Sequence, residues 1–401
     1  MGNTLTAAKP TYWSKRYQAQ LRARNITRSI TSSKEEASLT NGKTVDRPYF
    51  NRATIADLTL GTATYTPGAV TATSDTLTVN KWKAAAQRFT KDEMKQVLRY
   101  PSVVNKMIDD GAWRLNQYID RSVLGQYTNA AYNTDAAAYT KSTIYDGIGE
   151  AHKTLRAAGV EQSTPWYFAA DPEITQLIQN SQADRETMMG DARQPAGFGY
   201  TRDYSGFMVY ESPQALTWTG SINIATNPTE GDTVLIDGVT FTFNATPSGA
   251  GSVDIGGTAA ASVDNLVLLI NDPSTTTATG IALSAGDALK FVDSSSIALI
   301  AAVDGTTSIA ITSIKGRITL SETFTDTTDN VSDMVLHCLA GQMGNIDTVF
   351  QSDLETQVKD VSGTLATDYV TDVLWGVKMF NEGTLRALDF RVTTQSDSAS
   401  V

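Results

Sequence analysis

The 401-residue sequence contains very little cysteine and histidine. Its single cysteine, Cys338, excludes an intramolecular disulfide framework and a cysteine-based zinc site. Its two histidines, His152 and His337, leave little material for metal binding or acid–base chemistry. Two histidines of unknown geometry do not identify a Ser/His/Asp catalytic set. Gly249 and Gly251 form only a G-x-G motif, and it does not precede a helix as a dinucleotide-binding motif would. We therefore expect no enzymatic activity, no cofactor and no bound metal.

Long apolar segments are missing as well. No run of about 18 apolar residues occurs, so no transmembrane helix is expected, and residues 1–14 lack the apolar region of a secretion signal. Hydrophobic residues nevertheless make up 41% of the chain and charged residues 19%, a composition that supports a packed core. The length corresponds to two or three domains, or to one large domain that carries an insertion.

The net charge of −11 is divided unevenly along the chain. Residues 220–333 hold 13 acids and 3 bases, whereas the rest holds 30 acids and 29 bases. Residues 1–34 carry seven Lys or Arg and no acid. The chain thus has a basic arm, a balanced body and an acidic insert. Because Trp13 and Tyr17 lie among these basic residues, we interpret the arm as docking on a neighbouring subunit or a polyanion, with a disordered leader as the alternative.

A long β-hairpin is expected after the arm. Residues 54–65 and 71–82 are rich in β-favouring residues, and Pro67-Gly68 between them suits a type II turn. Each strand would span roughly 40 Å at about 3.3 Å per residue, and an isolated ribbon of that length is marginal in water. We therefore predict a protruding hairpin that rests on a partner subunit. Ordinary core strands are the alternative.

The body combines helices with antiparallel strands. Thr90 and Glu93 form a capping box, and Asp171-Pro172 supplies the N-cap and first residue of a later helix. Apolar spacings of three and four predict a helix of roughly 40 Å over 102–129. The other expected elements are a helix at 142–158, strands at 166–168 and 206–210, and a terminal hairpin of 373–379 with 388–392. This mixture predicts an α+β body.

The acidic segment has the residue composition and pattern of a small, mostly β domain. Asp237-Gly238 between two β-branched runs indicates a hairpin of 234–236 with 239–243, and Asp304-Gly305 provides a second turn of this kind. We further expect a helix entered at Ser262, and strands at 288–293, 296–303, 307–313 and 316–320. The segment is predicted to fold independently and to project from the body.

The order of these parts resembles the major capsid proteins of tailed bacteriophages, which have the Hong Kong 97-type fold. The likeness lies in four stretches: TSDTLTVNKWKAAAQRFTKDEMKQ (73–96), WYFAADPEITQLIQN (166–180), YSGFMVYESP (204–213) and TDVLWGVKMFNEGTLRALDFRV (371–392). It implies an α+β fold with an extended N-arm, a long hairpin called the E-loop, a spine helix, and an inserted mostly-β domain.

The resemblance also implies a division of the chain. The parts are an N-terminal arm at 1–46, an E-loop at 47–89, a peripheral domain at 90–140 completed by part of 334–395, the first part of an axial domain at 141–219, the insert at 220–333 and the return with the C-terminus at 334–401. Some members of the family crosslink their subunits through an E-loop lysine. Residues 53–80 contain none, so that crosslink is not expected.

The leading functional hypothesis is a subunit that self-assembles into the icosahedral shell of a virion around packaged phage DNA. The implied partners are copies of itself in hexamers and pentamers, a portal, a scaffold and double-stranded DNA bound non-specifically, with no membrane. A tail or fibre protein with a β-rich decoration module is the alternative, and a soluble enzyme is a third hypothesis. Candidate intersubunit contacts are Trp13, Tyr17, Arg22, Arg24, Tyr65, Pro67 and Gly68.

Overall fold

A computed structural model describes residues 26–36, 42–50, 55, 68–96, 100–189, 200–212, 215–293, 296–297, 299–314, 316, 318–361 and 363–393. The chain divides into two compact units. The first contains Thr27–Asn116 and Met343–Leu385, and the second contains Gln117–Gln342 and the residues from Arg386 onward. The predicted α+β class is confirmed, because both units combine helices with mainly antiparallel sheets.

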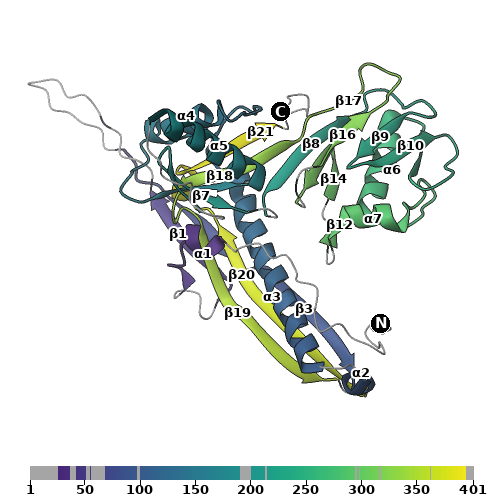
Figure 1. Ribbon diagram of the computed structural model, residues 1–401, viewed down its shortest axis with the longest axis horizontal. Coiled ribbons are helices and arrows are strands. Elements are labelled where there is room, and N and C mark those ends of the chain that lie inside the picture. The colour runs from purple at the N-terminus through teal and green to yellow at the C-terminus, as the bar shows by residue number, and fades with distance from the viewer. Residues whose placement is uncertain are drawn as a thin grey trace, which may run out of the picture. The chain divides into compact units, whose positions relative to one another are not determined.

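A three-stranded antiparallel sheet forms the centre of the first unit. Its order is β19 (Asp347–Asp360), β20 (Ala366–Lys378) and β3 (Lys81–Thr90). The predicted long helix is present as α3 (Tyr100–Leu124), which runs along this sheet (Figure 1) and continues into a 3₁₀ turn, Gly125–Asn129. Gly111 permits the close approach, because a Cβ at this position would lie 2.9 Å from the Cβ of Ala85 on β3.

The capping box is also confirmed. It opens the short helix α2 (Lys91–Gln96), where the backbone N–H of Thr90 donates to the Glu93 carboxylate over 2.9 Å. The backbone N–H of Glu93 in turn donates to Oγ1 of Thr90 over 3.3 Å. These bonds satisfy N–H groups that the first turn of a helix leaves without an intrahelical acceptor.

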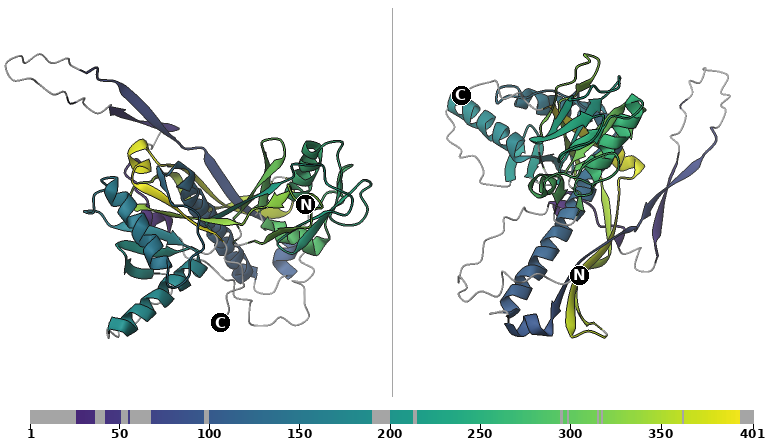
Figure 2. Two further views of the ribbon diagram at one scale, coloured as in Figure 1. Left: turned by 90° about the horizontal axis from the view of Figure 1, so that it is seen from above. Right: turned by 90° about the vertical axis from the view of Figure 1, so that its right-hand side faces the viewer.

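The hairpin after the arm differs from the prediction in its strands. β1 (Thr44–Phe50) pairs with β2 (Ala72–Thr78), and Figure 2 shows them side by side as a twisted ribbon. Residues 54–65 are therefore not the described partner of 72–78, and nearly all of them lie outside the described residues. Lys81 and Trp82, assigned to the second arm, begin β3 and pair with β20. The pairing register is set by the burial of Leu77 and Val79. The turn residues in the sequence do not indicate this burial.

A ten-stranded sheet dominates the second unit. Its main path is β14-β15-β8-β18-β5-β7-β6, with β17, β21 and β4 joined to it. The strands are β4 (Tyr132–Asn133), β5 (Trp166–Ala170), β6 (Tyr200–Tyr204), β7 (Phe207–Glu211), β8 (Thr217–Asn223), β14 (Leu299–Asp304), β15 (Ser308–Ser313), β17 (Asn330–Val331), β18 (Val335–Gln342) and β21 (Ala387–Thr393). The predicted helices are present as α4 (Ile144–Ala157) and α5 (Pro172–Met189). The core of the sheet includes Phe168, whose ring lies 5.3 Å from that of Phe390.

The acidic segment contains a second sheet with helices beside it (Figure 1). Its strand order is β11 (Ser252–Asp254), β10 (Val239–Asn244), β9 (Thr233–Ile236) and β16 (Leu320–Glu322). The first Asp-Gly hairpin is confirmed, with positive φ at Asp237 (52°) and Gly238 (75°). The helix expected at Ser262 begins earlier, as α6 (Ala259–Asn271), because Thr258 is its N-cap. The segment also contributes β14 and β15 to the ten-stranded sheet through β8.

Two predicted strands and one predicted hairpin need correction. Most of 288–293 belongs to helix α7 (Ala285–Phe291), followed by the short β12 (Val292–Asp293), which pairs with β13 (Ser296–Ile297). The strand predicted at 316–320 is shifted to β16. The terminal hairpin is wrong: β20 pairs with β19 and β3, whereas β21 pairs with β18 and β4, and the helix α8 (Asn381–Thr384) lies between them in sequence. Alternation marks a strand but does not identify its partner.

Candidate functional site

The predicted contact residues are mostly beyond what the structure describes. Six of the seven lie outside the described residues, namely Trp13, Tyr17, Arg22, Arg24, Tyr65 and Pro67. The seventh, Gly68, is exposed and lies shortly before β2. Their role in subunit contacts stays a prediction.

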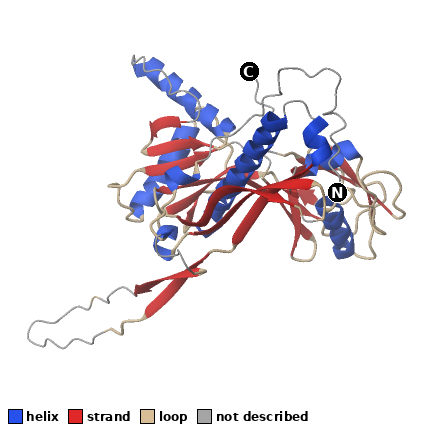
Figure 3. Cartoon of the chain, turned by 90° about the horizontal axis from the view of Figure 1, so that it is seen from below, coloured by secondary structure: helices blue, strands red, loops and turns tan. Residues whose placement is uncertain are grey.

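The ribbon of β1 and β2 is anchored at its base by apolar packing. Leu77 and Val79 are buried in a cluster with Val349 and Phe380, and Val45 packs against this cluster. Further along, apolar side chains are exposed: Phe50 at 63% and, just before β2, Val70 at 78%. Figure 3 shows the ribbon as two red strands that extend from this base. An exposed apolar end on a short ribbon is typical of a surface that another chain covers.

Arg47 of β1 is the first polar anchor of the ribbon. Its guanidinium lies 2.5 Å from Oε1 of Glu35 and 3.3 Å from Oδ2 of Asp347, and it stands 4.0 Å from the ring centroid of Phe380. Burial alone would lower the pKa of Arg47, but its bonds to Glu35 and Asp347 and their charges outweigh it and raise the pKa. Burial raises the pKa of Asp347 against the opposing attraction of Arg47. The arrangement fixes a cation over an aromatic face between two carboxylates.

Asp75 of β2 is the second polar anchor. Its Oδ1 accepts from Nζ of Lys378 at 3.0 Å, and its Oδ2 accepts from the backbone N–H of Asn381 at 3.2 Å. Because Arg47 and Asp75 are directly opposite in the register, both side chains lie on the same face of the ribbon. The ribbon is therefore held to its own unit by both of its strands.

One face of the three-stranded sheet is directed away from α3 and carries an exposed tryptophan. Ala85 contacts α3, so Trp82 and Arg88, at odd separations from it along the strand, lie on the opposite face. Trp82 is 71% exposed and donates from Nε1 to Asp372 over 3.0 Å. Arg88 forms two bonds to the carboxylate of Asp368, of 2.7 and 2.9 Å. Exposed aromatic side chains such as Trp82 are enriched in protein–protein contact surfaces.

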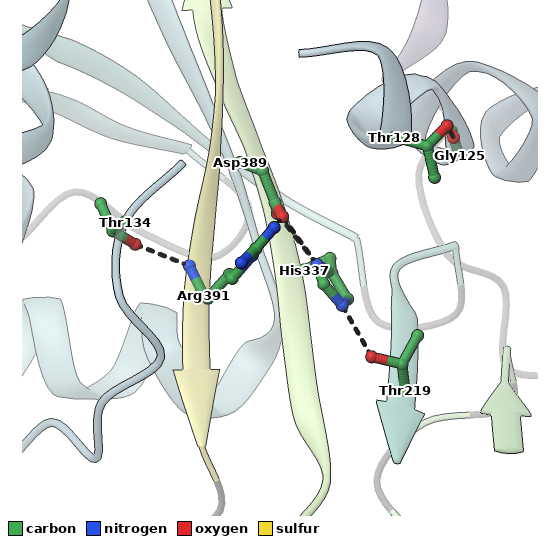
Figure 4. A network of polar contacts seen from close by, with 7 residues as sticks. All are labelled: Gly125, Thr128, Thr134, Thr219, His337, Asp389 and Arg391. Carbon is green, nitrogen blue, oxygen red and sulfur yellow. Dashed lines mark hydrogen bonds and ion pairs between the residues drawn. The ribbon is translucent and has the colours of Figure 1, made fainter. Parts of the chain in front are cut away.

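A buried polar network crosses the ten-stranded sheet (Figure 4). Nδ1 of His337 lies 2.8 Å from Oδ2 of Asp389, and Nε2 of His337 lies 2.8 Å from Oγ1 of Thr219. Nε of Arg391 donates to the same oxygen of Asp389 over 2.8 Å. The ring of Tyr127 is stacked on the imidazole at 4.2 Å. His337 and Asp389 are diagonal neighbours across β18 and β21, a proximity that sequence positions 52 residues apart do not reveal.

Thr219, His337 and Asp389 thus have the order of a hydroxyl–imidazole–carboxylate relay, which the sequence analysis did not find. Two features argue against catalysis. Thr219 pairs with Thr312 on one side and Val335 on the other, so the backbone around the hydroxyl is committed to the sheet and offers no oxyanion hole. Asp389 also forms an ion pair with Arg391. We interpret the network as a polar link that fixes three strands in register.

A partly buried carboxyl, that of Asp171, lies at the N-terminus of α5. Burial raises the pKa of Asp171 to about 7, against the opposing effect of a hydrogen bond from the backbone of Glu173, and the charges of Glu173 and Glu211 raise it further. Burial also raises the pKa of the nearby Cys338 thiol, with the charges of Asp171 and Asp389 adding to the effect. A protonated thiol is a poor nucleophile, so Cys338 is an inert core residue.

Neither a metal-binding cluster nor a membrane-spanning helix occurs among the described residues. These residues contain no group of three or more His, Cys, Asp or Glu side chains placed to hold a metal ion. None of the helices described is both long and apolar enough to cross a membrane. The other histidine, His152, is hydrogen-bonded to Gln162 at 3.1 Å and packs beside Trp166, as expected of a structural residue.

Comparison with known proteins relates this chain to phage structures. No protein-family model and no curated protein matches the sequence. A solved structure from Gordonia phage Cozz matches with a TM-score of 0.51 and 10% identity, covering 97% of this chain and 93% of that one. One from Mycobacterium phage Che8 matches with a TM-score of 0.50 and 13% identity, covering 95% and 96%. A structure described as the asymmetric unit of the bacteriophage PhiM1 mature capsid gives 0.49 and 12%, covering 96% and 93%.

The likeness extends over nearly the whole length of this chain and of the two phage proteins from Cozz and Che8. The chain therefore shares its fold with these two phage structures. The α+β fold predicted from the sequence agrees with this likeness, and the expected long helix α3 and the ribbon of β1 and β2 are present in the structure.

Proposed function

We propose that this protein is the major capsid protein of a tailed phage, the subunit that self-assembles into the icosahedral head shell around packaged DNA. The observation that carries the proposal is the extent of the fold likeness, which covers 97% of this chain and 93% of the Cozz protein rather than one module. Sequence stretches from 73 to 392 that resemble the same family add independent support. The protein is accordingly located in the virion.

Copies of the same chain are the principal partner in this proposal. Surfaces suited to such contacts are the exposed end of the ribbon with Phe50 and Val70, and the sheet face with Trp82. Hexamers and pentamers of the subunit would make up the shell. A portal, a scaffold and non-specifically bound double-stranded DNA are further partners that the function requires or permits.

The role is structural rather than enzymatic. The only relay-like set among the described residues, around His337, is committed to holding the sheet together. A tail or fibre role is not favoured, because the likeness to phage proteins includes the ribbon, the long helix and the final strands and is not confined to the β-rich insert.

Negative-stain microscopy of the purified protein tests the proposal. Closed shells or hexameric rings are the expected result. Tubes would favour the tail role, and particles that stay dispersed as monomers at every concentration and salt condition tried would contradict self-assembly. Exchanging Trp82 for Ser should weaken assembly and leave the circular dichroism spectrum unchanged, because this exposed side chain contributes little to the subunit's own core.

A further inference from the structure

The face of the ribbon that lies against its own unit has two layers. Val45 and Leu77, directly opposite each other, form an apolar layer at the base. Arg47 and Asp75, also directly opposite, form a charged layer one step further out. The apolar layer can serve as a pivot because it packs on Val349 and Phe380. The charged layer ties the ribbon to its own unit through the ion pairs of Arg47 and Asp75.

Arg47 and Asp75 carry opposite charges and face each other, yet each is paired with another segment. Arg47 is paired with Glu35 and Asp347, and Asp75 with Lys378. Directly opposite residues of an antiparallel pair have Cβ atoms about 4.5–5.5 Å apart, within reach of a cross-strand ion pair. Arg47 and Asp75 are therefore close enough to pair with each other in place of their observed partners.

This second pairing bears on how readily the ribbon can turn. Breaking a partly buried ion pair is costly when a charge is left without a partner. If the ribbon turned about its pivot, Arg47 and Asp75 would still satisfy one another. Lys378 has 37% of its side chain exposed and would be hydrated. Asp347 would stay buried, but burial raises the pKa of its carboxyl, which makes protonation easier than in an ordinary aspartate.

We propose that Arg47 and Asp75 form a two-point clamp that holds the ribbon to its own unit in the dispersed subunit, and that they exchange their outside partners for each other when the ribbon engages a neighbouring copy. The clamp itself follows from the contacts of one chain. The exchange on engagement rests on the proposed function, because it requires a second copy.

Distances between spin labels on the dispersed, full-length subunit test the clamp. One label is placed at Ser74→Cys on the ribbon and the other at Lys359→Cys on β19, both exposed positions of the same unit. Cys338 is fully buried, and a sample with no added cysteine checks that it stays unlabelled. The clamp predicts one narrow distance distribution, which is lost in the Arg47→Gln/Asp75→Asn double variant.

Asp46→Asn is the matched control. It also removes one negative charge from the ribbon, but Asp46 is exposed and bonded to Thr76 on the opposite face. Its distance distribution should equal that of the unsubstituted protein. An unchanged distribution in the double variant, or equal broadening by Asp46→Asn, would overturn the clamp.

Lys378→Met tests the exchange of partners. This change removes one outside partner and leaves Arg47 and Asp75 able to pair with each other. We expect a second, defined distance to become populated, in contrast to the featureless broadening of the double variant. Identical distributions in the two variants would overturn the exchange.

Assembly provides the readout that depends on the proposed function. If the unsubstituted protein forms shells, the double variant should form them more slowly or with altered diameters. Normal shells from the double variant would overturn the role of the exchange in assembly, whereas the label distances would still support the clamp. A failure of the unsubstituted protein to form shells would count against the proposed function and leave the clamp result readable.

Discussion

Asp171 is a residue at which burial makes stability depend on pH. Its pKa is raised from 3.8 to about 7 in the folded protein, so the folded state binds a proton that the unfolded state has already released between these values. Stability should therefore fall as pH rises from about 4 to 7, by at most about 1.4 kcal/mol per pH unit. Urea unfolding at several pH values measures this slope.

Asp171→Asn should remove the contribution of this carboxyl to that slope and stabilise the protein above pH 7, because Asn keeps the N-cap of α5 without a partly buried charge. Asp287→Asn is a suitable control. The hydrogen bond from Ser284 lowers the pKa of that exposed carboxyl, so its titration lies below the same window. A slope that survives in Asp171→Asn would assign the pH dependence to another group.

The network around His337 gives a second prediction at the residue scale. Asp389→Ala leaves His337 and Arg391 without their buried acceptor and should lower the free energy of unfolding by about 3 kcal/mol. Thr219→Val removes one neutral hydrogen bond and should cost about 1 kcal/mol. Urea midpoints at constant m-value measure both changes, with exposed Asp264→Ala on α6 as the control. Equal effects of Asp389→Ala and Asp264→Ala would contradict the structural role of the network.

At the scale of elements, local signals in the sequence were reliable and pairing was not. The capping box at Thr90, the Asp-Gly turn at Asp237 and the Asp-Pro entry at Asp171 depend on a few adjacent residues, and each was found where expected. The helix α7 was missed because β-favouring residues follow it, although Ser284 caps it: the backbone N–H of Asp287 donates to the Ser284 hydroxyl, which in turn donates to the Asp287 carboxylate.

Contacts between distant segments were not predictable from a single sequence. The terminal strands alternate as a hairpin would, yet β20 and β21 belong to different units. The partners of Arg47 and of His337 come from positions far along the chain, and periodicity carries no information on them. For the same reason, the fold class and the second strand of the ribbon were predicted correctly while the partner of that strand was not.

The ribbon gives a prediction at the element scale. Deleting residues 62–71 removes its outer connection and leaves β1, β2 and the apolar base intact. We expect a folded, dispersed subunit with near-native circular dichroism that does not assemble, because the proposed function assigns intersubunit contacts to this ribbon. Sedimentation and negative stain measure assembly. A deletion variant that forms shells of normal stability would contradict an intersubunit role.

At the scale of the whole molecule, if the protein forms the proposed shell around DNA, the division of charge predicts which parts face that DNA. Duplex DNA carries one phosphate charge per about 1.7 Å of its axis. The segment 220–333, with 13 acids and 3 bases, would be repelled from an inner surface, and the repulsion is screened over only about 8 Å at physiological salt. Residues 1–34, with seven bases and no acid, would be favoured there or along a neighbouring subunit. We therefore expect the acidic insert outside and the basic arm inside.

Limited proteolysis of intact, DNA-filled particles tests this orientation. A broad-specificity protease should first cut the insert, where residues 274–278 form an exposed run in the subunit. The arm should stay protected until the particles are opened, because the shell excludes the protease from its inner surface. Mass spectrometry of the fragments before and after opening separates the two segments. Early loss of the arm together with an intact insert would reverse the assignment, because it would place the basic arm outside and the acidic insert against the phosphates.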